Sequence, residues 1–290
     1  MDWSKFKNIA IAIFVVLNII LCVLISENKN KKYVMQDVQI RRMQAVFAKE
    51  NAAVYTTVDK EFYPMSMLKL SVNNINDSEV CKTFFGDINN MKKYVDNEKF
   101  VYDKDGNGQV AIYKNGLIKY TKENIIQSNK GIDKEQARND ADKYIDKLGF
   151  LKSKYIYTQL NITNEEYIFE YNSFYEKSLI LSNYVRIHFK QGEISQVDIS
   201  NFNIKGYTNE QREISSSDEV LINLLYEVKE KYNKEAQELH VMDIDLGYFV
   251  ESVDINDYLN IKAEPYYRIQ VNESDVYLIN AYTNEMLDNR

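Results

Sequence analysis

The sequence has 290 residues, a formal net charge of −7 and a hydrophobic content of 45%. This length is typical of roughly two domains of about 100–200 residues each, and the hydrophobic share is enough for a sizeable core. The acidic balance argues against nucleic acid as a partner, because nucleic-acid binding requires a basic face that displaces counterions. The two cysteines, Cys22 and Cys81, lie in segments of different character and predict no disulfide framework.

The chain opens with MDWSKFKNIAIAIFVVLNIILCVLISENKNKK, in which the residues from Ile9 to Ile25 are apolar except for one asparagine. A helix of this length reaches roughly 25 Å, which is the short end of what spans a bilayer. A buried core helix is the alternative, but a core rarely needs a helix that is apolar on every face. We therefore predict a transmembrane helix over residues 9–26, preceded by a short cytoplasmic segment at residues 1–8.

Cleavage of this segment is not favoured. A signal peptidase site requires small residues just before the cut, and the run ends in Leu24, Ile25, Ser26 and Glu27 instead. A lipoprotein signal would use Cys22, but the bulky Leu21 precedes it. The segment is predicted to remain as an anchor.

Flanking charge does not decide the orientation of this helix, because Lys5 and Lys7 on one side face three lysines at residues 29–32 on the other. A short N-terminal segment before a single anchor favours a cytoplasmic N-terminus, since long following domains translocate largely regardless of charge. The predicted location is the cell membrane, with the C-terminal domain extracellular.

Two residues of this segment are candidate partner-binding residues. Trp3 is suited to the membrane interface. Asn18 lies at mid-span, where hydrogen bonding to a neighbouring helix would contribute about 0.6–2 kcal/mol. The alternative for Asn18 is a tolerated polar side chain with no partner.

The remainder of the chain predicts a mixture of helices and antiparallel strands. Residues 33–51 are helical in pattern, either as a stalk or as the start of the first domain. Strands are expected at 53–58 and 65–72, and a meander at 100–120 with a tight turn at Asn115-Gly116. Capped helices follow at 131–150 and 215–232, with long aromatic-rich strands at 154–204 between them and further strands at the C-terminus.

An internal repeat links these elements. NYVRIHFKQGEI at 183–194 aligns without a gap on PYYRIQVNESDV at 265–276, so that Arg186 matches Arg268, and VAIYKNGLI at 110–118 resembles a weaker third copy. The predicted fold class is α+β: an N-terminal transmembrane helix followed by repeated units of one helix and an antiparallel meander. We assign the stalk and first unit to residues 27–130, the second unit to 131–207 and the third to 208–290.

No pattern in the sequence predicts catalysis, a cofactor or a metal site. DKDGNGQVAIYK at 103–114 resembles a calcium loop but has Lys114 where the bidentate glutamate belongs, so a β-turn is favoured. His188 and His240 have no second ligand at metal spacing, and Asp243 and Asp245 alternate as a solvent-facing strand would. For the repeated arginines, Arg186 and Arg268, a cross-strand charge partner is favoured over a binding role.

The start Met1-Asp2-Trp3-Ser4-Lys5, running directly into one apolar helix, resembles the YycH/YycI family of membrane-anchored regulatory proteins. The chain length, the helix-plus-meander repeats and the ending YYRIQVNESDVYLINAYTNEM are similar to that family as well, and the last hairpin resembles the PepSY-type fold. The third unit is accordingly expected to be PepSY-like.

The resemblance implies a non-enzymatic, single-pass regulator from Gram-positive bacteria. Its implied partners are the sensor histidine kinase WalK (also called YycG), which controls cell-wall metabolism in a two-component system, and a YycH-like protein. Contact would run through the membrane helix and the extracytoplasmic domain. An extracytoplasmic PepSY-type binding module for a peptide, wall fragment or protease is the alternative.

Overall fold

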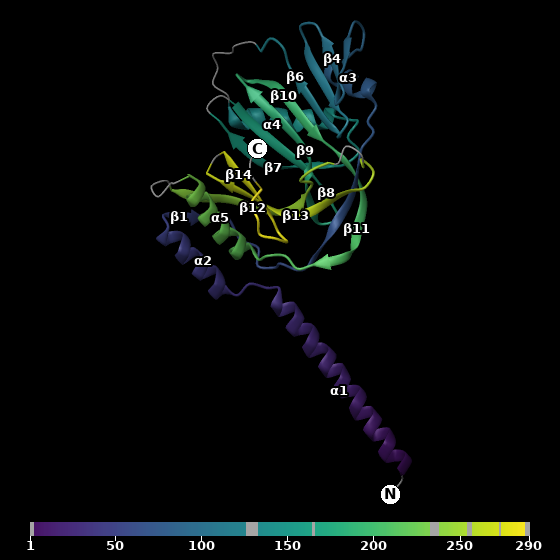
Figure 1. Cartoon of the computed structure of the whole chain (residues 1–290), viewed down its shortest axis with the longest axis vertical. Coiled ribbons are helices and arrows are strands. Elements are labelled where there is room, and N and C mark those ends of the chain that lie inside the picture. Colours follow the sequence, from purple (N-terminus) through teal and green to yellow (C-terminus); the bar gives the residue numbers. More distant parts are fainter. Residues whose placement is uncertain are drawn as a thin grey trace.

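A computed structural model of the chain describes residues 3–125, 133–163, 166–232, 238–253, 257–272 and 274–287. A long N-terminal helix projects away from a folded α+β body (Figure 1). The helices are α1 (Trp3–Lys32), α2 (Asp37–Lys49), α3 (Asp77–Phe85), α4 (Lys134–Lys147) and α5 (Ser217–Tyr232).

The strands form one large mixed sheet in the described part of the chain. Their bounds are β1 (Ala52–Val54), β2 (Met65–Val72), β3 (Lys92–Val95), β4 (Lys99–Lys104), β5 (Gly108–Tyr113), β6 (Leu117–Thr121), β7 (Tyr155–Ile162), β8 (Glu166–Tyr175), β9 (Ser178–Lys190), β10 (Glu193–Ser200), β11 (Phe202–Arg212), β12 (Leu239–Phe249), β13 (Ile261–Val271) and β14 (Asp275–Asn280). The main path runs β11-β2-β13-β12-β9-β10-β6-β5-β4-β3, while β1 pairs with β12, β14 with β13, and β7 with β8.

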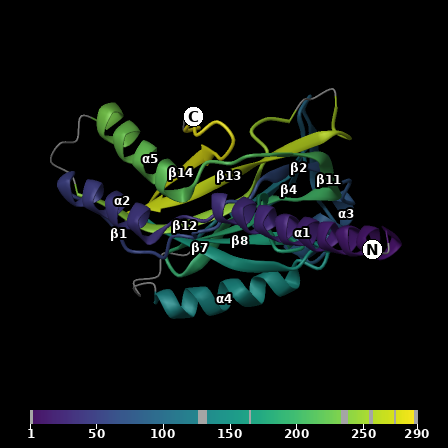
Figure 2. The ribbon, with the colours of Figure 1, turned by 90° about the horizontal axis from the view of Figure 1, so that it is seen from below.

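The helices cover opposite faces of this sheet. α4 lies on one side, and α5 with its neighbour α2 lies on the other (Figure 2). The α4 side buries Ala137 and Ala141 against strands such as β8, and the α5 side buries Leu221 and Leu225 against β12–β14. The two apolar cores therefore lie on opposite faces of the sheet, one over the β7–β10 strands and the other over the β12–β14 strands.

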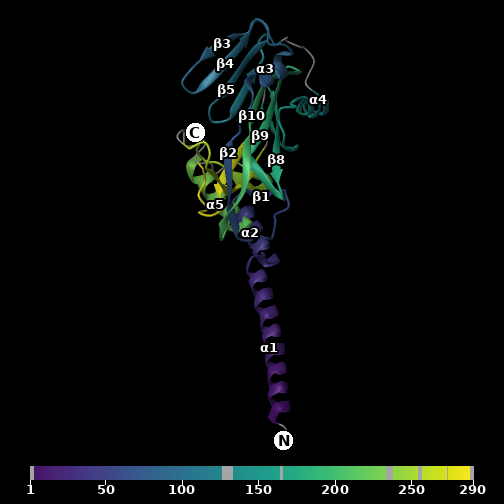
Figure 3. The ribbon, with the colours of Figure 1, turned by 90° about the vertical axis from the view of Figure 1, so that its right-hand side faces the viewer.

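Each of the three helices α3, α4 and α5 precedes an antiparallel meander: β3–β6, β7–β10 and β12–β14. The first meander extends to the end of the body farthest from α1 (Figure 3). The unit boundaries stay a prediction, and the one at 130–131 lies outside the described residues. Segments of the predicted first unit also join the third, since β1 pairs with β12 and β2 pairs with β13.

Most of the predicted elements are confirmed. The helix expected at 33–51 is α2, and its stripe residues Met43 and Phe47 are buried; it begins after a break that includes Tyr33, so it does not continue α1. Asp133 caps α4 through the Glu135 N–H, and the Glu219 carboxylate accepts from the Ser216 N–H before α5.

Three details differ from the prediction. β1 is shorter than the strand expected at 53–58, because the chain leaves β12 after Tyr55, whose N–H still donates to the carbonyl of Val241. The sequence pattern missed α3 and β3. α3 buries only Val80 and Cys81 from within its own length, and all four residues of β3 are exposed, so neither element has a clear periodicity.

Gly247 lies where the second and third predicted units meet, which are the two repeats with the aligned arginines. There β12 pairs in parallel with β9, with Gly247 opposite Leu179. A Cβ atom at this glycine would lie 2.8 Å from the Leu179 carbonyl oxygen and 2.9 Å from Leu181 Cγ. The close approach of β9 and β12 therefore requires a residue without a side chain.

We expect Gly247→Ala to lower the free energy of unfolding by about 1–3 kcal/mol, the range for overpacking a well-filled interior. Urea unfolding followed by circular dichroism measures this difference. Gly149→Ala is the matched control, because a Cβ there has nothing within 4 Å. Equal stability of the two variants would contradict a tight junction between the repeats.

Candidate functional site: a cavity between the two repeat hairpins

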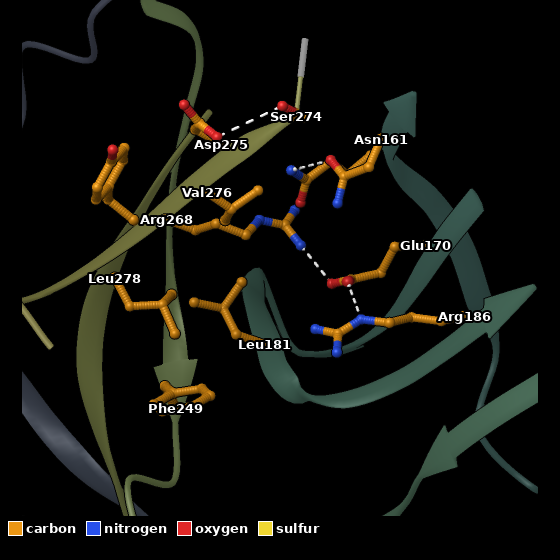
Figure 4. Close-up of a pocket in the computed structure, with 12 residues that line it drawn as sticks. Asn161, Glu170, Leu181, Arg186, Phe249, Arg268, Ser274, Asp275, Val276 and Leu278 are labelled. Atoms are coloured by element: carbon orange, nitrogen blue, oxygen red, sulfur yellow. Dashed lines mark hydrogen bonds and ion pairs between the residues drawn. The ribbon is translucent and has the colours of Figure 1, made fainter. Parts of the chain in front are cut away.

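A cavity of about 450 Å³ opens between the β7–β9 strands and the β12–β14 strands (Figure 4). Its lining combines charged and apolar side chains from both repeats. The lining residues are Gln159, Asn161, Glu170, Leu181, Arg186, Phe249, Arg268, Ser274, Asp275, Val276, Tyr277 and Leu278.

Glu170 is the centre of the charged part of this lining. Its Oε2 accepts from Arg186 Nε at 2.6 Å, and its Oε1 accepts from Arg268 Nη1 at 2.7 Å. The two arginines are the ones that the sequence repeat aligns. Corresponding positions in the repeats therefore converge on one carboxylate.

Strand register explains this convergence. Arg186 on β9 is directly opposite Glu170 on β8, and Arg268 on β13 is directly opposite Asp245 on β12. Each arginine thus faces an acid across its own antiparallel pair, as predicted for cross-strand charge partners. The link between Arg268 and Glu170 runs between the repeats, and sequence reasoning did not find it.

Arg268 is buried and uses most of its donors. Its side chain is 5% exposed; besides Glu170, its Nε and Nη2 donate to Asp245 Oδ2, and its Nη1 donates to Asn172 Oδ1 at 2.9 Å. Burial alone would raise the pKa of Glu170, but the charges of Arg186 and Arg268 outweigh it and hold this pKa below its usual value. Glu170 is therefore a buried anion that its cationic partners keep ionised.

Asn172 connects this network to an irregularity in the sheet. The β8–β9 ladder shifts between Asn172 and Ser173, so residues 181–183 bulge out of register. The Asn172 amide nitrogen donates to the carbonyls of Leu181 and Asn183, each at 3.3 Å. The Asn172 side chain thus donates to carbonyls of the bulge and accepts from Arg268. Because Leu181 belongs to the bulge, these bonds hold it at the cavity wall.

Arg186 makes fewer hydrogen bonds than Arg268, the arginine at the matching position of the other repeat. Its guanidinium stacks on the Tyr184 ring, with Cζ 4.1 Å from the ring centroid, and Nε binds Glu170. Among the residues that the structure describes, no hydrogen bond engages Nη1 or Nη2, and 41% of the side chain is exposed. The outer edge of the Arg186 guanidinium therefore has unused donors at the cavity.

The aspartates of β12 and the histidine of β9 have environments that differ from the prediction or were not predicted. Asp243 and Asp245 were expected on a solvent face, but Asp245 binds Arg268, and burial followed by the Asp245 charge raises the pKa of Asp243. His188 lies between two carboxylates, with Nδ1 3.6 Å from Glu166 and Nε2 3.4 Å from Asp198. Sequence spacing could not show this, because the three residues come from adjacent strands.

The residues singled out in the N-terminal segment lie on α1, apart from the cavity. Trp3 is 77% exposed and stacks on Phe6, with ring centroids 6.0 Å apart. The Asn18 amide donates to the Phe14 carbonyl of its own helix at 2.8 Å. This bond uses one amide hydrogen, so the role of both residues in partner binding stays a prediction.

The calcium-like segment at 103–114 forms the β4–β5 hairpin, and Lys104 pairs with Gly108 across its turn. Gly106 has φ of +80° and Gly108 of +126°, which explains the glycines. Asp105 accepts from Lys92 on the neighbouring β3 strand. The favoured β-turn interpretation agrees with this hairpin.

One helix in the described part of the chain is long and apolar enough to cross a membrane, over Phe6–Leu24, and none of that span is buried. Membrane anchors and signal sequences share this property. Helix α1 contains the whole predicted segment at 9–26, and the Phe6–Leu24 span begins three residues before that segment and ends two residues before its end.

Comparisons with solved structures concern the fold. The chain is similar to an uncharacterized protein from Eubacterium rectale ATCC 33656, with a TM-score of 0.50 and 13% identity over 82% of this chain and 90% of that chain. It is also matched by the Bacillus megaterium YpeB C-terminal domain, with a TM-score of 0.40 and 15% identity over 75% of this chain and 100% of that domain. No protein-family model and no curated protein matches the sequence. The first likeness shows a shared fold and no function.

We expect Glu170→Gln to lower the free energy of unfolding by about 3–5 kcal/mol, because it leaves two buried or half-buried arginines without their shared anion. The pKa of Glu170 is lower in the folded chain than its ordinary value of 4.5. Its stabilising contribution is therefore full above that value and is lost as the pH falls through the folded-state pKa. Below pH 4.5 the variant should lose stability less steeply than the wild type, by up to about 1.4 kcal/mol per pH unit.

Urea titrations at several pH values measure both effects. Glu193→Gln is the control, because it removes the carboxylate of a more exposed pair with Lys122 and should change stability by at most about 1 kcal/mol. Parallel pH profiles for Glu170→Gln and the wild type would show that Glu170 is not held ionised by the arginines.

Proposed function

We propose that this protein is a non-enzymatic regulator, anchored by a single transmembrane helix, whose extracytoplasmic body and helix bind a membrane partner. The observation that carries the proposal is the Phe6–Leu24 helix, which is entirely unburied by its own chain and projects from the body (Figure 1). An apolar helix of this kind requires lipid or another helix around it.

The joint between helix and body supports a mechanical role for the anchor. Lys32, at the end of α1, and the Tyr33 hydroxyl both bind Glu213, which follows β11. The Met35 N–H donates to the Lys60 carbonyl, and Tyr33 packs edge-on against Phe62. The helix end is thus fixed to the sheet by several contacts, so a partner bound along the helix would act on the body.

The resemblance to the YycH/YycI family names the partner within this proposal. It points to a cell-wall-controlling sensor histidine kinase of the WalK type, with a YycH-like protein beside it, and to a PepSY-like third unit. The N-terminus is then cytoplasmic and the body extracellular. Regulation would arise because the protein binds one conformation of the kinase better than the other and shifts its population.

The cavity between the repeats favours a second candidate function, a ligand-binding module for a peptide or wall fragment. Its volume of about 450 Å³ lies within the range of small-molecule sites, about 300–1,000 Å³. This function does not exclude the first, since a bound ligand could alter what the body presents to a membrane partner.

We expect the kinase to co-purify with the wild-type protein from solubilised membranes and to be lost when residues 1–26 are replaced by an unrelated apolar helix. Asn18→Leu should reduce recovery about 3- to 30-fold, corresponding to an interhelical hydrogen bond of about 0.6–2 kcal/mol. Val15→Leu, an apolar change one turn away, is the matched control. Unchanged recovery with the replaced helix would show that the helix is only an anchor.

Thiol labelling tests the orientation of the helix. Cys81 is fully buried, and burial raises the pKa of its thiol to about 11, so a membrane-impermeant maleimide should not label the folded wild-type protein. A cysteine at the exposed position 152, introduced as Lys152→Cys, should be labelled in intact cells. Labelling of this variant only after lysis would place the body in the cytoplasm.

A further inference from the structure

We propose that the cavity between the repeats binds a small ligand through a carboxylate, which the outer edge of the Arg186 guanidinium holds in a two-pronged hydrogen bond. The inference rests on the second candidate function, ligand binding by the body, and gives that function its chemistry. It does not depend on the membrane partner.

The first argument is the difference between the two repeated arginines. Arg268 donates hydrogen bonds to Glu170, Asp245 and Asn172, and its side chain is 5% exposed. Arg186 has the same place in its repeat, but only its Nε is engaged by a hydrogen bond in the described residues. A purely structural arginine would resemble Arg268, so the open edge of Arg186 is available for a ligand.

The second argument concerns which hydrogen-bonding groups remain unused. Both carboxylate oxygens of Glu170 already accept from arginines, and Asp245 Oδ2 accepts from Arg268. The unused capacity that lines the cavity beside Glu170 is on the Arg186 donors, which require an acceptor. Asp198 Oδ1 also has no hydrogen-bond partner in the described part of the chain, but Asp198 does not line the cavity. Paired Nη1 and Nη2 donors match the two oxygens of a carboxylate.

The charges around Arg186 permit this ligand. Glu170 is directly opposite Arg186 on β8, and Asp198 is opposite it on β10, where it accepts from Gln196 and lies beside His188. Asp275 is exposed at the rim, where solvent screens its charge. Glu170 orients Arg186 through Nε and leaves the opposite edge of the guanidinium for the ligand (Figure 4).

The third argument is the apolar wall beside this edge. Leu181, from the bulge that Asn172 stabilises, lies with Phe249 and Leu278 in one small apolar cluster, and all three line the cavity. A ligand with a carboxylate at one end and a short apolar group at the other would satisfy both parts of the lining. The C-terminal residue of a peptide has this chemistry, and so does a free acylated amino acid.

Isothermal titration calorimetry on the full chain in lipid nanodiscs tests the inference. The probes are N-acetyl-leucine and acetyl-alanyl-leucine, each compared with its C-terminal amide. We expect each acid that binds to do so at least about tenfold more tightly than its amide, as hydrogen bonds to a charged group require. Binding of the dipeptide acid alone would identify a peptide end as the ligand, and binding of both acids would include free acylated amino acids.

Variants assign the effect to Arg186. Arg186→Gln should remove the preference for the acid, and Arg186→Lys, which keeps the charge and loses the fork, should retain only part of it. Arg212→Gln is the control, because Arg212 is exposed and packs on Tyr282 outside the cavity. If Arg186→Gln does not fold, the comparison of acid with amide on the wild type still tests recognition of the carboxylate. An undiminished preference in Arg186→Lys would then reject the two-pronged bond to Arg186.

Three results would overturn the inference: equal affinity for acid and amide, a preference that survives Arg186→Gln in the folded variant, or no binding of either acid. Equal affinity for acid and amide would leave ligand binding itself standing and reject only the carboxylate. Absence of all binding would reject the carboxylate ligand, whereas a pull-down with the full chain tests the broader ligand-binding function separately.

Discussion

The shared carboxylate of Glu170 is the interaction on which the centre of the structure depends. An isolated buried carboxylate would be neutralised by protonation, and an isolated buried arginine would be expelled. Glu170 is ionised because Arg186 and Arg268 reach it from two sides. Since those arginines belong to different repeats, the same ion cluster that satisfies the charges also fixes the relative position of the two hairpins.

The internal repeat, with its two unequal environments, explains why one cluster contains both an arginine with most of its donors bonded and one with unused donors. In each repeat, antiparallel register places an acid opposite the arginine. Glu170 accepts from both arginines, and Asp245 accepts further hydrogen bonds from Arg268. Arg186 keeps donors that no residue in the described ranges uses. The bulge at residues 181–183 then places an apolar wall beside those donors.

A continuous set of strands joins the end of the body next to α1 to this cluster. Glu213, which holds Lys32 and Tyr33, follows β11; β11 pairs with β2, and β2 pairs with β13, the strand of Arg268. Such a ladder is stiff, so it can carry a displacement without supplying two states of its own. The segment between α1 and α2 does not belong to this set of paired strands. Its Val34 forms a single isolated bridge to Glu61.

Local patterns were enough to predict most elements, and the reasons for the failures are physical. Capping residues and apolar stripes located α2, α4 and α5, because those signals lie within one turn of each helix. The aligned arginines correctly indicated cross-strand pairs. Their meeting at Glu170 could not be predicted, because it depends on parallel pairing of β9 with β12, which Gly247 permits by lacking a side chain. A site made by contact between repeats leaves no spacing in the sequence. The trace of this one is a pair of polar residues, Glu170 and Asn172, that alternate with aromatic residues in the buried middle of β8.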